Sequence, residues 1–247
     1  MGFRRFYCEK IIKPYTELSG SEAHHLVSVL RLQKGDHVEI FDGRGALADA
    51  VIKEVAGRNA ILQILNIKII SQRTDFRIII AVSIAKGERF DWLVEKCTEL
   101  GVDRISPVLF ERTIKFAAGA QTIQRWFHLS ISGAKQSGRC ILPIIDKPAP
   151  LKEILAKLKT DYPSAQILLG CPDLQTEPFM QFCKSKKDVI VLVGPEGGIS
   201  PVEMRFCLEA GAKPVRFTDS ILRVETAAIA CAAILSAGRL AKKNCNF

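Results

Sequence analysis

A short glycine-rich loop, Gly194-Pro195-Glu196-Gly197-Gly198, carries residues suited to binding a ligand. Glycines let a ligand approach the backbone closely, and Glu196 supplies the single charge of the loop. The loop lacks the Lys-Ser/Thr of a phosphate-binding P-loop and the G-x-G-x-x-G spacing of a dinucleotide site. Backbone groups beside one carboxylate therefore favour a nucleoside with hydroxyls, or a cationic cofactor, over a di- or triphosphate. The alternative is a tight turn in which Glu196 only caps a helix.

The segments on either side of this loop predict a strand followed by a helix. Residues 189–193 read Val-Ile-Val-Leu-Val, which is typical of a strand buried on both faces. Ser200 and Glu203 have the spacing of a capping box, Pro201 suits the first helical position, and Gly211 suits the end of the helix. Open α/β sheets bind ligands at the carboxyl ends of their strands, so the loop is expected at such an edge.

A second set of candidate residues lies on the helix predicted over 121–137. Spacings of three and four place polar and basic side chains on one helical face. These are Arg125, His128, Ser132, Lys135 and Arg139. A solvated face is the simpler interpretation, but the Gln136-Ser137-Gly138 turn before Arg139 favours a functional role for that arginine.

Composition narrows the class of protein. The 247 residues are 48% hydrophobic, which is enough for a core, and the net charge of +9 favours a polyanionic partner. The sequence has neither eighteen consecutive apolar residues nor the apolar region of a signal peptide, so we expect a cytoplasmic protein without a membrane partner. The eight cysteines are never two to four residues apart, so we expect no metal site.

Two patterns divide the chain and predict an α/β fold class. Short strands, glycine turns and one helix over 21–31 predict a small β-barrel in the first part. From residue 76, long apolar strands alternate with amphipathic helices, which predicts a largely parallel, helix-covered sheet. The segment 225–238 is apolar on all sides, so we expect a helix buried in the core or against another subunit.

Six motifs occur in order along the chain. They are His24-His25-Leu26-x-x-Val29-Leu30-Arg31 with Gly35-Asp36; Lys86 with Glu95-Lys96-x-x-Glu99-Leu100-Gly101-Val102; Glu111-Arg112; Gln136-Ser137-Gly138-Arg139; the glycine loop with Glu203; and Ile221-Leu222-Arg223-x-Glu225-Thr226-Ala227. Each is weak alone, but in this order they are specific. With them, the chain resembles from end to end the RsmE-type 16S ribosomal RNA uridine-N3 methyltransferases of the SPOUT superfamily.

The resemblance implies a PUA-like RNA-binding β-barrel over 1–72 and a SPOUT methyltransferase domain over 73–247 that contains a trefoil knot. It implies a homodimer that binds S-adenosyl-L-methionine and methylates N3 of a uridine in 16S rRNA, in an assembled small ribosomal subunit. The cofactor residues that it implies are Leu169, Gly170, Val193, Gly194, Glu196, Gly197, Gly198, Ile199, Phe217, Thr218, Ile221, Leu222 and Arg223. Members often carry glycine where this chain has Thr218, so the third cofactor loop is expected to differ in shape.

Uridine N3 must lose a proton before it can attack a methyl group, and a cation should face the resulting charge. The catalytic candidates are Arg139 and Arg223 as cations and Glu196 as proton acceptor. The RNA-binding candidates are Arg4, Arg5, His24, Arg31, Arg125, Lys135 and Arg139. The candidate dimer contacts are Ala228, Cys231, Ala232 and Leu235.

Three other functions compete with this interpretation. One is a SPOUT ribose 2′-O RNA methyltransferase, since nothing in the loops distinguishes a base nitrogen from a ribose oxygen. Another is a non-catalytic ribosome-assembly factor that binds RNA without a cofactor, against which the intact glycine loop argues. The weakest is a nicotinamide oxidoreductase, because G-x-G-x-x-G is missing.

Overall fold

The computed structural model describes residues 4–57, 59–71, 76–113, 119–173, 175–183 and 187–243. The chain forms two compact units, one of Met1–Gln72 with Ala134–Leu142 and one of Arg73–Gly133 with Pro143–Phe247. Of the polar hinge that the sequence predicts over 71–75, residues 72–75 lie outside the described residues, as does Cys245. The cysteines of the described part are free thiols.

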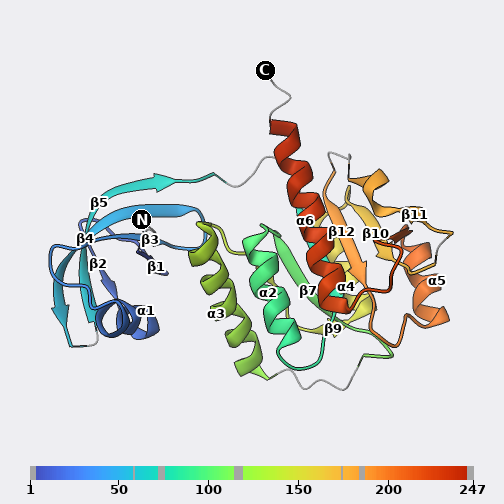
Figure 1. The fold of residues 1–247 in the computed structure, drawn as a ribbon, viewed down its shortest axis with the longest axis horizontal. Helices are drawn as coiled ribbons and strands as arrows, with labels where there is room; N and C mark the ends of the chain where they lie inside the picture. Colours follow the sequence, from blue (N-terminus) through green and yellow to red (C-terminus); the bar gives the residue numbers. More distant parts are fainter. Residues whose placement is uncertain are drawn as a thin grey trace. The chain divides into compact units, whose positions relative to one another are not determined.

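The first unit is built on a five-stranded sheet in the order β1-β3-β4-β5-β2 (Figure 1). Its strands are β1 (Arg5–Tyr7), β2 (Tyr15–Leu18), β3 (His37–Phe41), β4 (Ala46–Ala56) and β5 (Asn59–Ile69). β1 runs parallel to β3, and the other pairs are antiparallel. Register shifts in the β4–β5 pair add local twist, as bulges do. The PUA-like sheet that the sequence predicted is confirmed as a half-barrel, with β2 as a strand that the pattern did not predict.

The helix predicted over 21–31 is shorter and irregular. Helix α1 (Gly20–His24) passes directly into a π-helical turn, η1 (His25–Val29), in which the Leu30 amide donates to the His25 carbonyl at 2.9 Å. Arg31 then adopts a left-handed φ of 52°, which a continuing right-handed helix does not allow. The apolar spacing correctly predicted the buried side of this segment, where Ala23 and Leu26 are fully buried.

The second unit contains an eight-stranded sheet in the order β11-β13-β10-β12-β6-β7-β8, with β9 also paired to β7. Its strands are β6 (Ile78–Ser83), β7 (Arg104–Leu109), β8 (Ile144–Ile145), β9 (Ala149–Pro150), β10 (Gln166–Gly170), β11 (Glu177–Pro178), β12 (Val189–Val193) and β13 (Lys213–Arg216). Every pair is parallel, which confirms the predicted sheet type.

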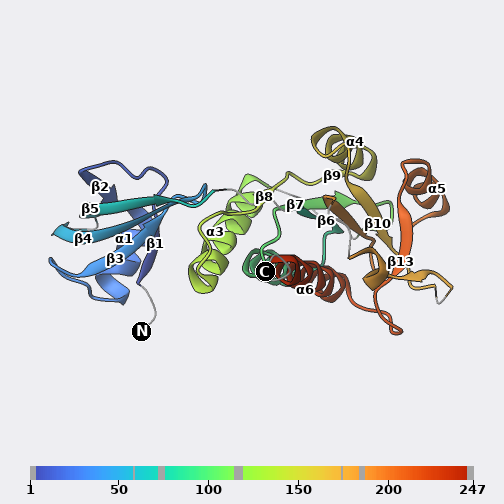
Figure 2. The same ribbon diagram turned by 90° about the horizontal axis from the view of Figure 1, so that it is seen from above.

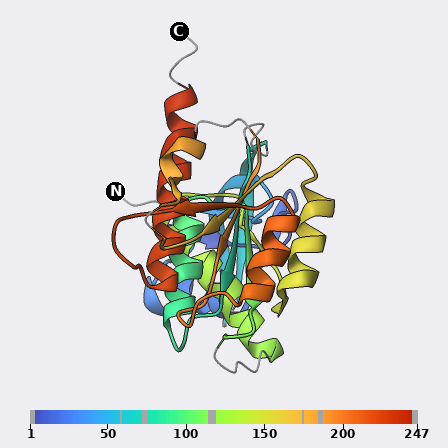
Figure 3. The ribbon, with the colours of Figure 1, turned by 90° about the vertical axis from the view of Figure 1, so that its right-hand side faces the viewer.

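Helices cover both faces of this parallel sheet. They are α2 (Arg89–Glu99), α3 (Ala120–Ser137), α4 (Leu151–Asp161), the 3₁₀ turn η2 (Phe179–Phe182), α5 (Pro201–Glu209) and α6 (Val224–Lys243). Figures 2 and 3 show α2 and α6 on one face and α4 and α5 on the other. Along β6, Ile78 and Ile80 belong to one core and Ile79 and Ala81 to the other. A strand buried on both faces has this continuous apolar character.

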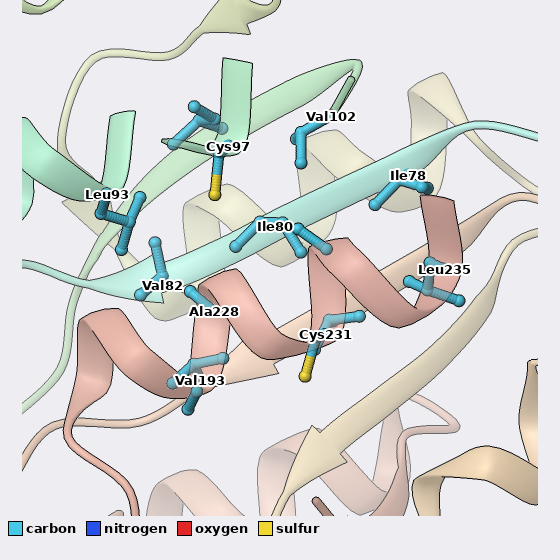
Figure 4. Packing of buried hydrophobic residues seen from close by; sticks show 14 of the residues in the cluster. Ile78, Ile80, Val82, Leu93, Cys97, Val102, Val193, Ala228, Cys231 and Leu235 are labelled. Carbon is cyan, nitrogen blue, oxygen red and sulfur yellow. The ribbon is translucent and has the colours of Figure 1, made fainter. Parts of the chain in front are cut away.

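Helix α6 packs against the core of its own chain. Figure 4 shows Ala228, Cys231 and Leu235 turned toward β6 and its neighbours. With Ala232, these residues are all 0% exposed, so the expectation that they form the dimer contact is wrong. The small side chains of Ala228, Cys231 and Ala232 let the helix lie close to the sheet, and the chain itself covers them. Of the helices that the structure describes, none is long and apolar enough to cross a membrane.

Candidate functional site

The candidate site lies where three neighbouring parallel strands end. β13, β10 and β12 are adjacent, with Gly170 opposite Val215 and Leu169 opposite Leu192. The segments that follow these strands leave the same sheet edge and line a pocket of ≈ 260 Å³. This is the carboxyl edge at which open α/β sheets bind ligands, as the sequence predicted for the glycine loop.

Most of the residues predicted to bind the cofactor line this one pocket. They are Gly170, Val193, Gly194, Glu196, Gly198, Ile199, Phe217, Thr218, Ile221 and Leu222. Leu169 instead is 0% exposed in the core under α4. Gly197 and Arg223 are not among the lining residues. Contact of the cofactor with Gly197 and Arg223 stays a prediction, and so does its contact with the lining residues.

Further residues that were not among the predicted cofactor contacts also line the pocket. They are Cys171, Pro172, Pro195, Met204, Arg216, Ser220, Val224 and Ala227. Cys171, Pro195 and Ser220 lie within the three cofactor loops that the resemblance implies, 169–171, 193–199 and 217–223, and Pro172, Arg216 and Val224 directly adjoin these loops. Met204 lies in the first turns of α5 and gives no signal in the sequence, because only the fold brings it to the strand ends.

Two glycines keep the pocket walls close to the backbone. A Cβ added at Gly170 falls 2.6 Å from the Phe217 ring, and one added at Gly194 falls 2.5 Å from Ile199 Cγ1. Any side chain at these positions pushes a lining residue aside. Gly197 differs, because its Cβ position faces Arg112 at 3.3 Å and lies outside the pocket lining.

Helix α5 fixes the end of the glycine loop as predicted. The Glu203 amide donates to Ser200 Oγ at 3.3 Å, and the Ser200 amide donates to the Glu203 carboxylate at 3.1 Å. This is a complete capping box. The third loop is closed without glycine, because the Thr218 hydroxyl donates to the Ser220 carbonyl at 2.7 Å.

Arg89 is the ion partner of the loop carboxylate. Its Nη1 donates to Glu196 at 2.7 Å and lies 3.9 Å from Glu225. Glu225 is 4% exposed, and its Oε2 has no hydrogen-bond partner in the part of the chain that is described. Sequence reasoning missed Arg89, since it lies 107 positions from Glu196 and begins an ordinary amphipathic helix.

The predicted RNA contacts fall into two groups. Arg5 pairs with Glu39 and donates to the Arg139 carbonyl at 3.1 Å, and Lys135 pairs with Glu22 at 2.9 Å. The Arg5 side chain is only 9% exposed, so a packing role fits Arg5 and Lys135 better than phosphate binding.

The other candidates are more accessible. His24 and Arg31 are exposed. The Arg4 side chain is 50% exposed and lies 3.5 Å from Asp36, and Arg125 is 59% exposed and lies 2.5 Å from Asp91. An ion pair between exposed side chains, such as that of Arg4 and Asp36, contributes little to stability. The described residues contain no group of three or more side chains arranged to hold a metal ion.

Two family models match successive parts of the chain. A family described as an RNA methyltransferase domain matches residues 72–236, and one described as an RNA methyltransferase PUA domain matches residues 18–65. Ribosomal RNA small subunit methyltransferase E of Synechocystis is 29% identical over 89% of this chain and 72% of its own length. Ribosomal RNA small subunit methyltransferase E 2 of Borreliella burgdorferi is 30% identical over 83% of this chain and 84% of its own.

A solved structure has the same fold. The crystal structure of a ribosomal RNA small subunit methyltransferase E from Neisseria gonorrhoeae, bound to S-adenosyl methionine, is 28% identical with a TM-score of 0.85. The match covers 95% of this chain and 97% of that one. The parallel sheet with its pocket and the two family matches place the chain in the class of RNA methyltransferases with a PUA domain. Within this class, the chain belongs to the ribosomal RNA small subunit methyltransferase E family.

Proposed function

We propose that this protein transfers a methyl group from S-adenosylmethionine to N3 of a uridine in 16S rRNA. The observation that carries the proposal is the pocket, in which three loops from adjacent parallel strands meet in a member of this family. The assignment of the base nitrogen, and not a ribose oxygen, as the methyl acceptor rests on the similarity of the six motifs along the whole chain.

The residues of the pocket fit this cofactor. Apolar side chains such as Ile199, Phe217 and Leu222 suit an adenine ring, and the close backbones at Gly170 and Gly194 leave peptide groups within reach of ribose hydroxyls. Glu196 supplies a carboxylate for a cationic ligand. When bound, S-adenosylmethionine supplies an electrophilic methyl group.

The protein's own part in catalysis is to stabilise charge on the acceptor and to take its proton. Removing the N3 proton spreads negative charge onto the two flanking carbonyl oxygens, so a preorganised cation lowers the barrier. Arg223, which follows Leu222 of the pocket lining, and Arg139 are the proposed cations. Glu196 is the proposed proton acceptor, because its carboxylate borders the pocket.

RNA recognition is proposed for the exposed cations of the first unit. Reversing charge at Arg4 and Arg31 should weaken RNA binding, and each lost phosphate contact should lower the salt slope by roughly 0.7 to 0.9. Filter binding at several salt concentrations measures both quantities. Unchanged affinity and slope in the double variant remove this unit from RNA binding.

The assembly and location of the protein are also proposals. We propose a cytoplasmic homodimer whose chain end passes through a trefoil knot, as in the family that the sequence resembles. Because α6 is covered by its own chain, exposed apolar residues such as Val202 (68%) and Ile221 (86%) replace its buried residues as candidate contacts. Light scattering that gives only a species of 27.3 kDa contradicts the dimer.

The test of function uses purified protein, S-adenosylmethionine with a labelled methyl group, and small ribosomal subunits that lack the modification. Nuclease digestion and mass spectrometry then locate the label. We expect N3-methyluridine. Label on a ribose shows a 2′-O methyltransferase, and no label despite RNA binding shows an assembly factor. Parallel reactions with naked 16S rRNA test the preference for assembled subunits.

A further inference from the structure

A second, smaller cleft adjoins the cofactor pocket. It has a volume of ≈ 30 Å³ and shares Pro195, Glu196 and Val224 with the larger pocket. Its other lining residues are Ser83, Ile84, Ala85, Lys86, Arg112 and Gly197. The pocket and the cleft thus meet at the glycine loop, and the cleft is lined by two cations, Lys86 and Arg112.

Sheet topology explains why these residues meet. β12, β6 and β7 are neighbouring parallel strands, with Val193 opposite Val82 and Ser83 opposite Val108. The segments that follow them leave the same edge of the sheet. Glu196, Lys86 and Arg112, although far apart in the sequence, each lie a few residues beyond one of these strand ends.

Local hydrogen bonds hold the cleft in shape. Arg112 Nη1 donates to the Gly197 carbonyl at 3.0 Å, which joins the segment after β7 to the glycine loop. The Ser83 and Thr113 hydroxyls lie 3.2 Å apart, and the Phe110 amide donates to Thr113 Oγ1 at 2.8 Å. The walls are therefore connected to one another and are not independent surface side chains.

The cations of the cleft are not neutralised by carboxylates. Lys86 is exposed, and the ion pairs among the described residues do not include it. Arg112 contacts a carbonyl oxygen, which carries no formal charge. The nearby carboxylate of Glu196 accepts from Arg89 instead. Positive charge thus faces the border of the two hollows, where a ligand group with negative charge is favoured.

The size of the cleft limits what enters it. A volume of ≈ 30 Å³ is room for about two water molecules, since one needs roughly 10 to 15 Å³ by the same measure. The cleft therefore suits the edge of a flat ring and not a whole nucleoside. Carbonyl oxygens on such an edge become negatively charged when the ring nitrogen between them loses its proton.

We propose that this cleft receives the carbonyl edge of the acceptor base, and that Lys86, assisted by Arg112, stabilises the charge on that edge. The inference rests on the proposed function and adds two cations to Arg139 and Arg223. In the transfer, the ring nitrogen gives its proton to a base and its electron pair forms the new N–C bond. The methyl–sulfur bond breaks, and its electron pair stays on sulfur.

The test compares Lys86→Met, Lys86→Arg and the control Lys147→Met, which removes a charge that is also exposed but lies outside the cleft. We expect Lys86→Met to slow single-turnover methylation by about 10²-fold, with cofactor and RNA affinities close to wild type. The methylation rate of Lys86→Met should also rise at a higher pH than that of wild type, because the acceptor nucleobase has lost a cation that stabilises its ionised form. Lys86→Arg should restore most of the rate, and Lys147→Met should match wild type.

A binding measurement gives a second readout. RNA with 5-fluorouridine at the target position has a more acidic N3 proton than RNA with uridine there. At alkaline pH and in the presence of the demethylated cofactor, the wild-type protein should therefore bind the 5-fluorouridine RNA more tightly. Lys86→Met should lose this preference. The inference is overturned if Lys86→Met keeps the wild-type methylation rate, pH profile and preference for 5-fluorouridine RNA. It is also overturned if weaker binding of cofactor or RNA alone explains the loss of rate. A wild-type protein that neither binds cofactor nor methylates RNA refutes the proposed function itself.

Discussion

Nη1 of Arg89 lies 2.7 Å from the Glu196 carboxylate and 3.9 Å from that of Glu225. One guanidinium thus joins the first residue of α2, the glycine loop after β12 and the first turn of α6. Glu225 is 4% exposed, so Arg89 offsets a carboxylate that has little contact with water.

Replacing Arg89 with Met should weaken both the fold and the pocket. We expect a loss of roughly 1 to 3 kcal/mol in the free energy of unfolding, because Glu225 is left buried without a cation. Cofactor affinity should also fall, since Glu196 loses its partner. Denaturant unfolding and calorimetry measure the two effects. Arg44→Met removes an arginine that pairs more loosely with Asp42, at 3.6 Å, and should cost under about 0.5 kcal/mol.

The double variant Arg89→Met with Glu225→Gln gives a sharper test. Removing the charge of Glu225 should recover part of the lost stability, because the unpaired buried carboxylate is gone. If Arg89→Met matches Arg44→Met, or if the double variant is no more stable than Arg89→Met, the pairing does not stabilise the site.

Gly170→Ala should reduce cofactor affinity while leaving the protein folded. The new Cβ meets the Phe217 ring at 2.6 Å, and that ring must move within the pocket lining. Gly119→Ala is the matched control, because its Cβ meets nothing within 4 Å. Calorimetry with S-adenosylmethionine should show weaker binding for the first variant alone. Equal affinities in the two variants mean that Phe217 does not shape the cofactor site.

Two leucines of α6 distinguish the core from the surface. Leu235 is 0% exposed and Leu240 is 60% exposed. Leu235→Ala should lower the free energy of unfolding by about 2 to 5 kcal/mol, because it leaves a cavity against the sheet. Leu240→Ala should change it by less than about 0.5 kcal/mol. Similar losses in both variants contradict the packing of α6 in Figure 4.

Asp146 should make stability depend on acidic pH. Burial alone raises the pKa of its carboxyl, but hydrogen bonds from Arg104, Lys157 and Ser106 hold that pKa below the ordinary 3.8. A depressed pKa in the folded state adds stability above the unfolded value, and this is lost as pH falls through the folded value.

Unfolding of wild type and Asp146→Asn from pH 6 down to pH 3 measures this contribution. The variant should be less stable by about 3 to 5 kcal/mol at pH 6, since Arg104 is left buried without one of its partners. The difference between the two proteins should shrink as pH falls below about 4. A difference that stays constant over this range contradicts the depressed pKa.

Local patterns predicted much of the fold. The apolar run at 189–193 predicted β12, and the Ser200–Glu203 spacing predicted the capping box of α5, because both depend on residues close in sequence. Residue 31 shows the limit of such patterns. The apolar spacing favoured one continuous helix, whereas the chain forms a π-helical turn and Arg31 reverses its φ.

The site was predictable where its loops carry glycine motifs and not where it depends on tertiary contacts. The motifs identified ten of the pocket residues, but Arg89 and Met204 reach the site only because α2 and α5 begin beside it. For α6, the apolar composition correctly predicted burial. It did not distinguish a partner subunit from the chain's own sheet, because both present apolar surface.

The most direct test of the central claim is mass mapping of 16S rRNA from cells with and without the gene for this protein. We predict that one uridine carries an N3 methyl group in the parent strain, loses it in the deletion strain and regains it when the wild-type gene is restored. Restoration with Gly170→Ala should give partial methylation. An unchanged methylation map in the deletion strain, or the loss of a ribose methyl group instead, contradicts the account.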